Sequence, residues 1–266
     1  MKIRKLVLPV AGQGTRLRPL TLTTPKNLIK LREKPILEYA LDEAVQAGIE
    51  EVIVVVSPEH EARYESYFRE ARKKYPGLSF RAVVQSAPLG DGHAVLQARG
   101  YLGKEPFAVR FCDDIIVGDK PSLVSLIETF EREMMPTIFL ERVPKEAVVR
   151  YGVVKAEPIK GKERIYKITG SVEKPKLEEA PSDLIIVGGY ALTSEILEEL
   201  QKMSGNIREE KDALRLNHVF MKLFGEGKHI LGWEFPGVRL DCGTVEGLAN
   251  AEEFLMALED SEVAKL

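Results

Sequence analysis

Cysteine is scarce in this sequence, and its scarcity excludes a disulfide-rich secreted domain. Only two cysteines, Cys112 and Cys242, occur among 266 residues, and two cannot form a disulfide framework. Free cysteines suit a reducing compartment, where most of them are buried as small hydrophobic residues. We therefore expect a cytoplasmic protein in which both thiols lie in the interior.

Long hydrophobic runs are also missing. No stretch approaches the roughly 18 consecutive apolar residues that a membrane span needs, so we expect no membrane partner. The chain begins with a basic segment and a short apolar run over residues 6–11, followed at once by a glycine-rich loop. That run is too short for a signal peptide, and it predicts a buried first strand instead.

The sequence has no excess of positive charge. Its formal net charge is -3, with 38 Lys and Arg against 41 Asp and Glu. A broad positive field of the kind that attracts nucleic acid is therefore excluded, and we expect no nucleic-acid partner. If the substrates are polyanions, local Lys and Arg side chains must attract them.

What the sequence does contain is a regular alternation of strands and helices in its first half. Apolar runs rich in β-branched residues alternate with amphipathic helical patterns. This alternation predicts an α/β fold with an open, mostly parallel sheet and helices on both faces, whose ligands bind beyond the carboxyl ends of the strands. We predict strands over 5–10, 51–56, 79–85, 107–112 and 137–141, and helices over 36–47, 59–73, 93–100 and 120–134.

The alternation weakens after residue 143, where strands follow one another without long helices between them. We predict one domain over 1–258, with a core over 1–143 and a second part over 144–258 that returns to it. The last residues, 259–266, are expected to form a frayed tail. The predicted strands of this part are 151–157, 164–172, 184–192, 229–235 and 238–240, and the predicted helices are 194–202, 212–224 and 244–258.

A glycine-rich loop follows the first predicted strand. Gly12 and Gly14 allow backbone conformations that approach a ligand closely, and their N–H groups can bind phosphate oxygens. Thr15 adds a hydroxyl, Arg16 a guanidinium suited to phosphate, and Lys26 an ammonium. A G-x-G turn alone is weak evidence, but basic side chains that converge on it indicate a phosphate-binding site.

Two common nucleotide-binding loops do not fit this segment. The Walker loop requires the pattern G-x-x-x-x-G-K-[ST], which is absent. The dinucleotide-binding loop requires a third glycine, and Leu17 occupies its place. The phosphate site must therefore belong to another class of protein.

Polar residues also stand where other predicted strands end. Asp113 ends the fourth strand and Asp241 a short late strand, and Mg²⁺ favours one or two such carboxylates together with substrate phosphates. Asp114 would point the other way along an extended chain, so we expect it to support the site rather than to bind the metal directly. Gln85 ends the third strand, and its amide suits the edge of a uracil or thymine ring.

In their order along the chain, these motifs resemble those of the sugar-phosphate nucleotidyltransferase family, and most closely its bacterial-type UTP–glucose-1-phosphate uridylyltransferases. The resemblance extends from about residue 4 to 258 and implies an open, Rossmann-like nucleotidyltransferase sheet carrying a smaller mixed β sugar-side region. The blocks that carry it are G-x-G-T-R-x-x-P-x-T with a following P-K, Lys34-Pro35-Ile36, Gln85 with Gly90 and Gly92-His93-Ala94-Val95, Asp113-Asp114-Ile115-Ile116, Tyr151-Gly152-Val153-Val154, Val172-Glu173-Lys174-Pro175-Lys176 and Asp241-Cys242-Gly243.

The resemblance implies transfer of a uridylyl group from UTP to glucose-1-phosphate, with Mg²⁺ as cofactor and a homo-oligomeric assembly. The attacking phosphate is already anionic near neutral pH because its second pKa is ~6, so no general base is needed. Catalysis then consists of neutralising charge and aligning the reactants. The implied catalytic residues are Arg16, Lys26, Asp113 and Lys174; the nucleotide-binding residues are Ala11, Gly12, Gly14, Thr15, Gln85, Gly90 and Gly92; the sugar-binding residues are Gly152, Glu173, Lys174 and Gly188; and the metal ligands are Asp113 and Asp241.

The sequence departs from the family pattern in several places. Asn27 stands where a glutamate is usual, and Asp91 lies between the two glycines of the base-binding loop. The region 204–220 lacks the family's usual stretch, and the C-terminal end is shorter. Three alternatives therefore stay open: a thymidylyltransferase that uses dTTP, another nucleotide-sugar pyrophosphorylase, and a regulator that binds nucleotide sugars without turnover. A glycosyltransferase is disfavoured because its Asp-x-Asp motif is absent.

Overall fold

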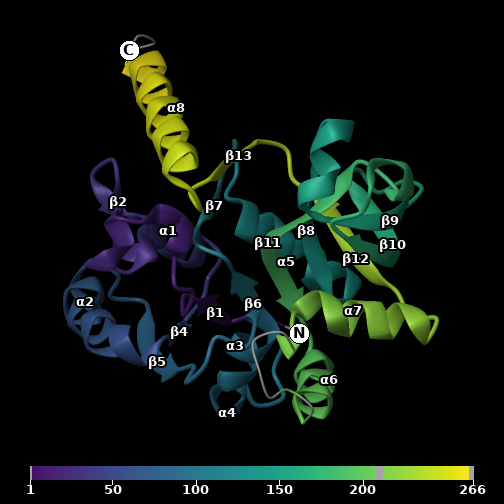
Figure 1. Ribbon diagram of the computed structural model, residues 1–266, viewed down its shortest axis with the longest axis horizontal. Helices are drawn as coiled ribbons and strands as arrows, with labels where there is room; N and C mark the ends of the chain where they lie inside the picture. Colours follow the sequence, from purple (N-terminus) through teal and green to yellow (C-terminus); the bar gives the residue numbers. More distant parts are fainter. Residues whose placement is uncertain (1, 206, 208–211, 264–266) are drawn as a thin grey trace.

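A computed structural model describes residues 2–205, 207 and 212–263 of the chain. In these residues a nine-stranded sheet has the order β5-β4-β1-β6-β11-β8-β12-β10-β9, with helices packed against it (Figure 1). Two small two-stranded sheets accompany it, β13-β7 and the pair formed by β2 (Lys30–Leu31) and β3 (Lys34–Pro35). The fold is therefore α/β, as the sequence pattern predicts.

The first half of the sheet is parallel. Strands β5, β4, β1 and β6 lie side by side and run in the same direction. β4, with the sequence EVIVVV, is buried along almost its whole length, because β-branched side chains fill both faces of a covered strand. The bounds of these elements are β1 (Lys5–Pro9), α1 (Ile36–Gln46), β4 (Glu51–Val56), α2 (Glu61–Lys74), β5 (Ser79–Val84), α3 (Asp91–Gln97), α4 (Arg99–Leu102), β6 (Phe107–Arg110) and α5 (Ser122–Glu133).

Helices cover both faces of the sheet, and alternate strand residues divide the interior into two cores. Leu6 and Leu8 of β1 point toward the core that contains α1, α2 and α5. Val7, between them, points toward the core that contains α3 and two later helices, α6 (Ser194–Ser204) and α7 (Leu216–Gly225). The two-residue period of the strand therefore places one hydrophobic layer on each face.

Beyond β6 the sheet becomes mixed, so the prediction of a mostly parallel sheet holds only for the first half. β11 runs antiparallel between β6 and β8, and β10 is antiparallel to both of its neighbours. Short connections without a crossover helix favour such antiparallel pairs. The strands of this part are β8 (Thr137–Arg142), β9 (Gly152–Pro158), β10 (Ile165–Glu173), β11 (Leu184–Leu192) and β12 (Ile230–Glu234).

A short antiparallel ribbon brings the end of the chain back to the first half. Its strands are β7 (Asp114–Val117) and β13 (Val238–Asp241), and their register places Asp241 opposite Asp114. The backbone N–H of Cys242 also donates to the carbonyl of Asp113 at 2.8 Å. No strand was predicted over β7 from the sequence, although this strand brings two distant aspartates together.

The last helix, α8 (Val245–Val263), extends away from the rest of the molecule (Figure 1). It continues to Val263, so the prediction of a frayed tail from residue 259 is wrong for 259–263; residues 264–266 lie outside the described part. Glu259 is held by an ion pair with Arg32 at 2.8 Å. Among the described residues no helix is both long and apolar enough to cross a membrane.

Candidate active site

The glycine-rich loop leaves the end of β1 and continues into short 3-10 turns, among them Thr15–Leu17 and Lys26–Leu28. Gly14 has a φ of 60°, and a β-carbon there would lie 2.9 Å from the Thr21 side chain. The Thr21 hydroxyl also donates to the carbonyl of Gly14 at 2.9 Å. Only glycine fits this position easily, and the resulting turn carries Arg16 and Lys26 toward the end of β6.

Lys26 and Asp113 form an ion pair at the carboxyl end of β6. The Lys26 Nζ lies 2.5 Å from the Asp113 Oδ2. Burial by itself would raise the pKa of Asp113, but Lys26, with a smaller contribution from Arg16, holds the pKa below its usual value. The carboxylate is therefore ionised at neutral pH and faces two cationic side chains.

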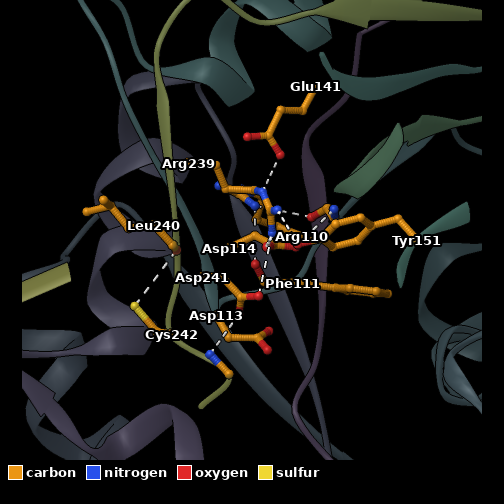
Figure 2. Close-up of polar contacts among 12 residues, drawn as sticks. Arg110, Phe111, Asp113, Asp114, Glu141, Tyr151, Arg239, Leu240, Asp241 and Cys242 are labelled. Atoms are coloured by element: carbon orange, nitrogen blue, oxygen red, sulfur yellow. Dashed lines mark hydrogen bonds and ion pairs between the residues drawn. The ribbon is translucent and has the colours of Figure 1, made fainter. Parts of the chain in front are cut away.

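The second predicted metal ligand, Asp241, reaches the same place from β13. A β-carbon built on Gly243 would lie 2.9 Å from the Asp241 Oδ1, 3.0 Å from an Arg16 guanidinium nitrogen and 3.4 Å from the Asp113 Oδ2. Two carboxylates and a cationic group, which the sequence separates widely, therefore surround one point. Figure 2 shows Asp113 and Asp241 close together at the foot of a larger polar network.

Arg239 organises that network, and it was not among the site residues predicted from the sequence. Its guanidinium donates to Glu141 at 2.5 Å, to Asp114 at 2.9 Å and to the Tyr151 hydroxyl at 3.3 Å, and it lies 3.8 Å from Asp241 (Figure 2). Arg239 stands two residues before Asp241 on one strand, so both side chains lie on the same face. That spacing beside a predicted metal ligand is the signal that could have identified it.

Asp114 turns away from Asp113, as its place in an extended strand predicts. Burial and the neighbouring Asp113 charge raise the pKa of Asp114, and Arg239 opposes this shift. Its Oδ2 accepts a hydrogen bond from the backbone N–H of Gly188 at 3.2 Å. Asp114 therefore contacts Arg239 and the β11 backbone, and it lies on the opposite face of the strand from Asp113.

A cavity of about 290 Å³ opens beside Lys26 and Asp113. It brings together predicted site residues from three strand ends, as expected for the carboxyl edge of a parallel sheet. Among the described residues, the predicted Gly14, Thr15 and Gly92 do not line it. The lining residues are Pro9, Ala11, Gly12, Lys26, Gln85, Pro88, Gly90, Asp91, Ala94, Phe111 and Asp113.

The two glycines of the base-binding loop are needed for packing against the segment that precedes α7. Gly90 has a φ of 101°, and a β-carbon there would collide with the backbone of Leu214. A β-carbon on Gly92 would lie 2.9 Å from the Arg215 backbone. Of the two, only Gly90 also lines the cavity, and the role of Gly92 at the base stays a prediction.

The structure shows the surroundings of Asp91 and Asn27, the two residues that depart from the family pattern. The Asp91 carboxylate accepts the backbone N–H of Leu216 at 2.7 Å and caps the start of α7, although burial raises its pKa. Asn27 is 3% exposed and its Oδ1 has no hydrogen-bond partner among the described residues. Part of the altered region, residues 206 and 208–211, lies outside the described residues.

Three of the predicted sugar-binding residues lie beside Tyr151 or its neighbour Gly152, and the fourth, Gly188, lies against Phe111 and Asp114. Lys174 has a φ of 46°, uncommon for a residue other than glycine, and its backbone N–H donates to the Tyr151 carbonyl at 2.9 Å. Gly152 adjoins the Glu173 carboxylate, which lies 3.7 Å from Arg215. On Gly188 a β-carbon would lie 2.8 Å from the Asp114 carboxylate. All four residues thus gather near Tyr151 and Asp114.

The donor set fits Mg²⁺ better than a softer metal. Among the described residues, no group of three or more His, Cys, Asp and Glu side chains could hold a metal. Mg²⁺ does not need such a group, because it favours one or two carboxylates with substrate phosphates and water completing the shell. Both thiols are buried, and burial raises the pKa of Cys112 and of Cys242 to about 12, so neither supplies a thiolate.

Comparisons with known proteins agree with this geometry. Residues 5–257 match the family model described as Nucleotidyl transferase. The UTP–glucose-1-phosphate uridylyltransferase of Bacillus subtilis (strain 168) is 35% identical, over 98% of this chain and 94% of the relative. That of Pseudomonas aeruginosa is 32% identical, over 95% of each chain.

Solved structures of related proteins have a similar fold. A UDP-glucose pyrophosphorylase complexed with UDP-glucose superposes with a TM-score of 0.85 at 31% identity, covering 96% of this chain and 99% of the other. The UTP-bound UGPase from Acinetobacter baumannii gives a TM-score of 0.79 at 28% identity, over 95% and 93% of the two chains. This chain therefore belongs to the nucleotidyl transferase family.

Proposed function

We propose that the chain transfers a uridylyl group from UTP to glucose-1-phosphate, giving UDP-glucose and pyrophosphate. The observation that carries the proposal is the meeting of Asp113 and Asp241 beside Lys26 and Arg16, at the edge of a cavity that Gln85 also lines. The names of the full-length relatives support the same reaction.

The reaction joins two polyanions, so its main barrier is repulsion. Two unit charges about 4 Å apart repel by about 4 kcal/mol at an effective dielectric of ~20. Lys26 and Arg16 lie where they can bind the triphosphate and stabilise charge on the leaving pyrophosphate. Mg²⁺ held by Asp113 and Asp241 would supply further positive charge to the phosphate oxygens.

The attacking group is a phosphate oxygen of glucose-1-phosphate, which displaces pyrophosphate from the α-phosphorus of UTP. No side chain has to remove a proton, because the attacking phosphate is already anionic near neutral pH. Lys174 binds this phosphate and Glu173 accepts hydrogen bonds from the sugar hydroxyls. Their positions next to Gly152 and Tyr151 support this assignment.

Pyrophosphate release from a panel of nucleotides and sugar phosphates tests the proposal. UTP, dTTP and CTP are each combined with glucose-1-phosphate, galactose-1-phosphate or no sugar phosphate, with Mg²⁺ or with excess chelator. We expect release to require UTP, glucose-1-phosphate and Mg²⁺ together. A preference for dTTP would replace the proposal with a thymidylyltransferase, and binding of UDP-glucose without release would replace it with a regulator.

A further inference from the structure

His93 contacts Gln85, the residue that we expect to bind the base, from outside the nucleotide cavity. Gln85 is 5% exposed and lines the nucleotide cavity, whereas His93 is not among the residues that line it. The Gln85 Nε2 lies 3.0 Å from the Gly90 carbonyl and 3.0 Å from the His93 Nδ1. The side-chain amide of Gln85 is therefore held by two groups, and one of them, the His93 ring, belongs to a residue that does not line the cavity.

The two contacts determine which atom of Gln85 remains for a ligand. The Gly90 carbonyl can only accept, so the atom that faces it must be the amide nitrogen. That nitrogen has two protons, and the second one points to His93. The Gln85 Oε1 accepts no hydrogen bond from the described residues and is not sealed from solvent. The carbonyl oxygen is thus the atom left for a bound base.

The ring of His93 must be neutral and bare at Nδ1 for this arrangement to hold. Burial lowers the pKa of His93, which favours the neutral ring at pH 7. A neutral imidazole has one bare nitrogen, so only one of its two glutamine neighbours can donate to it. The Gln97 Nε2 donates to the His93 backbone carbonyl at 3.1 Å and also lies 3.1 Å from the His93 Nε2, so an amide nitrogen faces the ring on this side as well. The arrangement with Gln85 requires that the bare nitrogen be Nδ1 and that the ring proton be on Nε2.

We propose that His93 is a positioning residue that locks the Gln85 amide with its oxygen toward the base, and that this lock makes the site select uracil over cytosine. The inference deepens the proposed function and rests on it. Uracil presents an N3–H donor, which a carbonyl oxygen accepts. Cytosine presents a bare N3, which would face the Gln85 oxygen lone pair to lone pair. Without His93, only the Gly90 carbonyl holds the amide, so Gln85 turns more easily and can offer its N–H to cytosine.

The test compares the selectivity of His93→Leu with that of His93→Asn. The leucine removes the acceptor, whereas the asparagine Oδ1 can occupy the place of Nδ1. We expect the ratio of kcat/KM for UTP over CTP to fall about tenfold to a hundredfold in His93→Leu and to be largely restored in His93→Asn. Gln97→Leu is the matched control, and its ratio should equal that of the wild type.

Two outcomes would overturn the inference. One is a His93→Leu variant that loses activity equally with UTP and CTP, because a merely structural role lowers both rates together. The other comes from nitrogen-15 spectra of the histidine rings in the wild type, a measurement that requires neither a folded variant nor turnover. A proton on Nδ1 of neutral His93 would show that this nitrogen cannot accept from Gln85. If the wild type prefers UTP and His93→Leu has the same ratio of kcat/KM for UTP over CTP, only this inference is refuted. If the wild type does not turn over UTP at all, the proposed function is refuted.

Discussion

Asp113 and Asp114 are neighbours in sequence, yet their surroundings drive their pKa values in opposite directions. Lys26 lies 2.5 Å from Asp113 and lowers its pKa against the effect of burial. Asp114 points to the other face, where burial and the Asp113 charge raise its pKa despite Arg239. Two adjacent carboxyl groups thus have different tasks because successive side chains of a strand point to opposite faces.

At this scale we expect Asp113→Asn and Asp241→Asn each to lower kcat by at least about a hundredfold, because each removes a charge aimed at the phosphates. Pyrophosphate release with UTP and glucose-1-phosphate measures the loss, and circular dichroism checks that the fold is kept. Asp119→Asn, an exposed residue shortly after Asp114, is the matched control and should keep normal activity. Normal turnover in Asp113→Asn or Asp241→Asn would remove the metal assignment.

Among the structural elements, the β7–β13 ribbon depends on one buried guanidinium. The Arg239 side chain is 9% exposed and contacts carboxylates from β7 and β8. In Arg239→Met these carboxylates stay buried without their partner, so we expect a loss of about 3–5 kcal/mol in the free energy of unfolding. Urea unfolding measures it.

Lys222→Met is the control for that experiment, because Lys222 is 39% exposed and pairs with Glu199 on the surface. Its loss should stay below about 1 kcal/mol. Equal losses in the two variants would mean that Arg239 is no more important to the ribbon than an ordinary surface cation.

The loop before α3 gives a second prediction about elements. Gly90→Ala places a β-carbon against the Leu214 backbone at a φ of 101°, whereas Gly103→Ala has a φ of 65° and open space around it. We expect Gly103→Ala to lose about 1–3 kcal/mol from backbone strain alone, because its ψ of -131° lies outside the left-handed helical region. Gly90→Ala should lose clearly more and also weaken UTP binding, which calorimetry measures. Equal effects would show that the close approach to Leu214 is unimportant.

An ion-pair cluster between α6 and α7 makes stability depend on pH. Lys202 and Lys222 donate to Glu199 and lower its pKa from 4.5 to about 2. A lowered pKa in the folded state adds stability above the unfolded value, and this stability is lost as the pH falls from 4.5 toward 2. Glu199→Gln should therefore be less stable than the wild type at pH 7 by at most about 1 kcal/mol, with a gap that narrows below pH 4.5. A gap that stays constant in urea unfolding across this range would contradict the assignment.

For the whole molecule, the first half was predictable because its signals are local. The run EVIVVV specifies β4, and Gly48 ends the pattern of α1 with a φ of 71°. The places of the glycine-rich loop and of the two aspartates were also predictable, since glycine, basic and acidic residues stand at strand ends. Their proposed roles still await the experiments above.

The second half was less predictable because its organisation depends on distant pairing. Nothing local in residues 184–192 indicates that β11 is inserted antiparallel between β6 and β8. The strand β7 is only four residues long and is stabilised by β13, which lies more than a hundred residues later. Arg239 was missed for the same reason, since its carboxylate partners come from other strands.

The most direct test of the account is the binding of Mn²⁺, a spectroscopic substitute for Mg²⁺, in the presence of UTP. Electron paramagnetic resonance counts the bound ions per chain and gives their affinity. The account predicts one tightly bound ion per chain in the wild type and much weaker binding in both Asp113→Asn and Asp241→Asn. Unchanged affinity in either variant would contradict the claim that these two carboxylates share one cation.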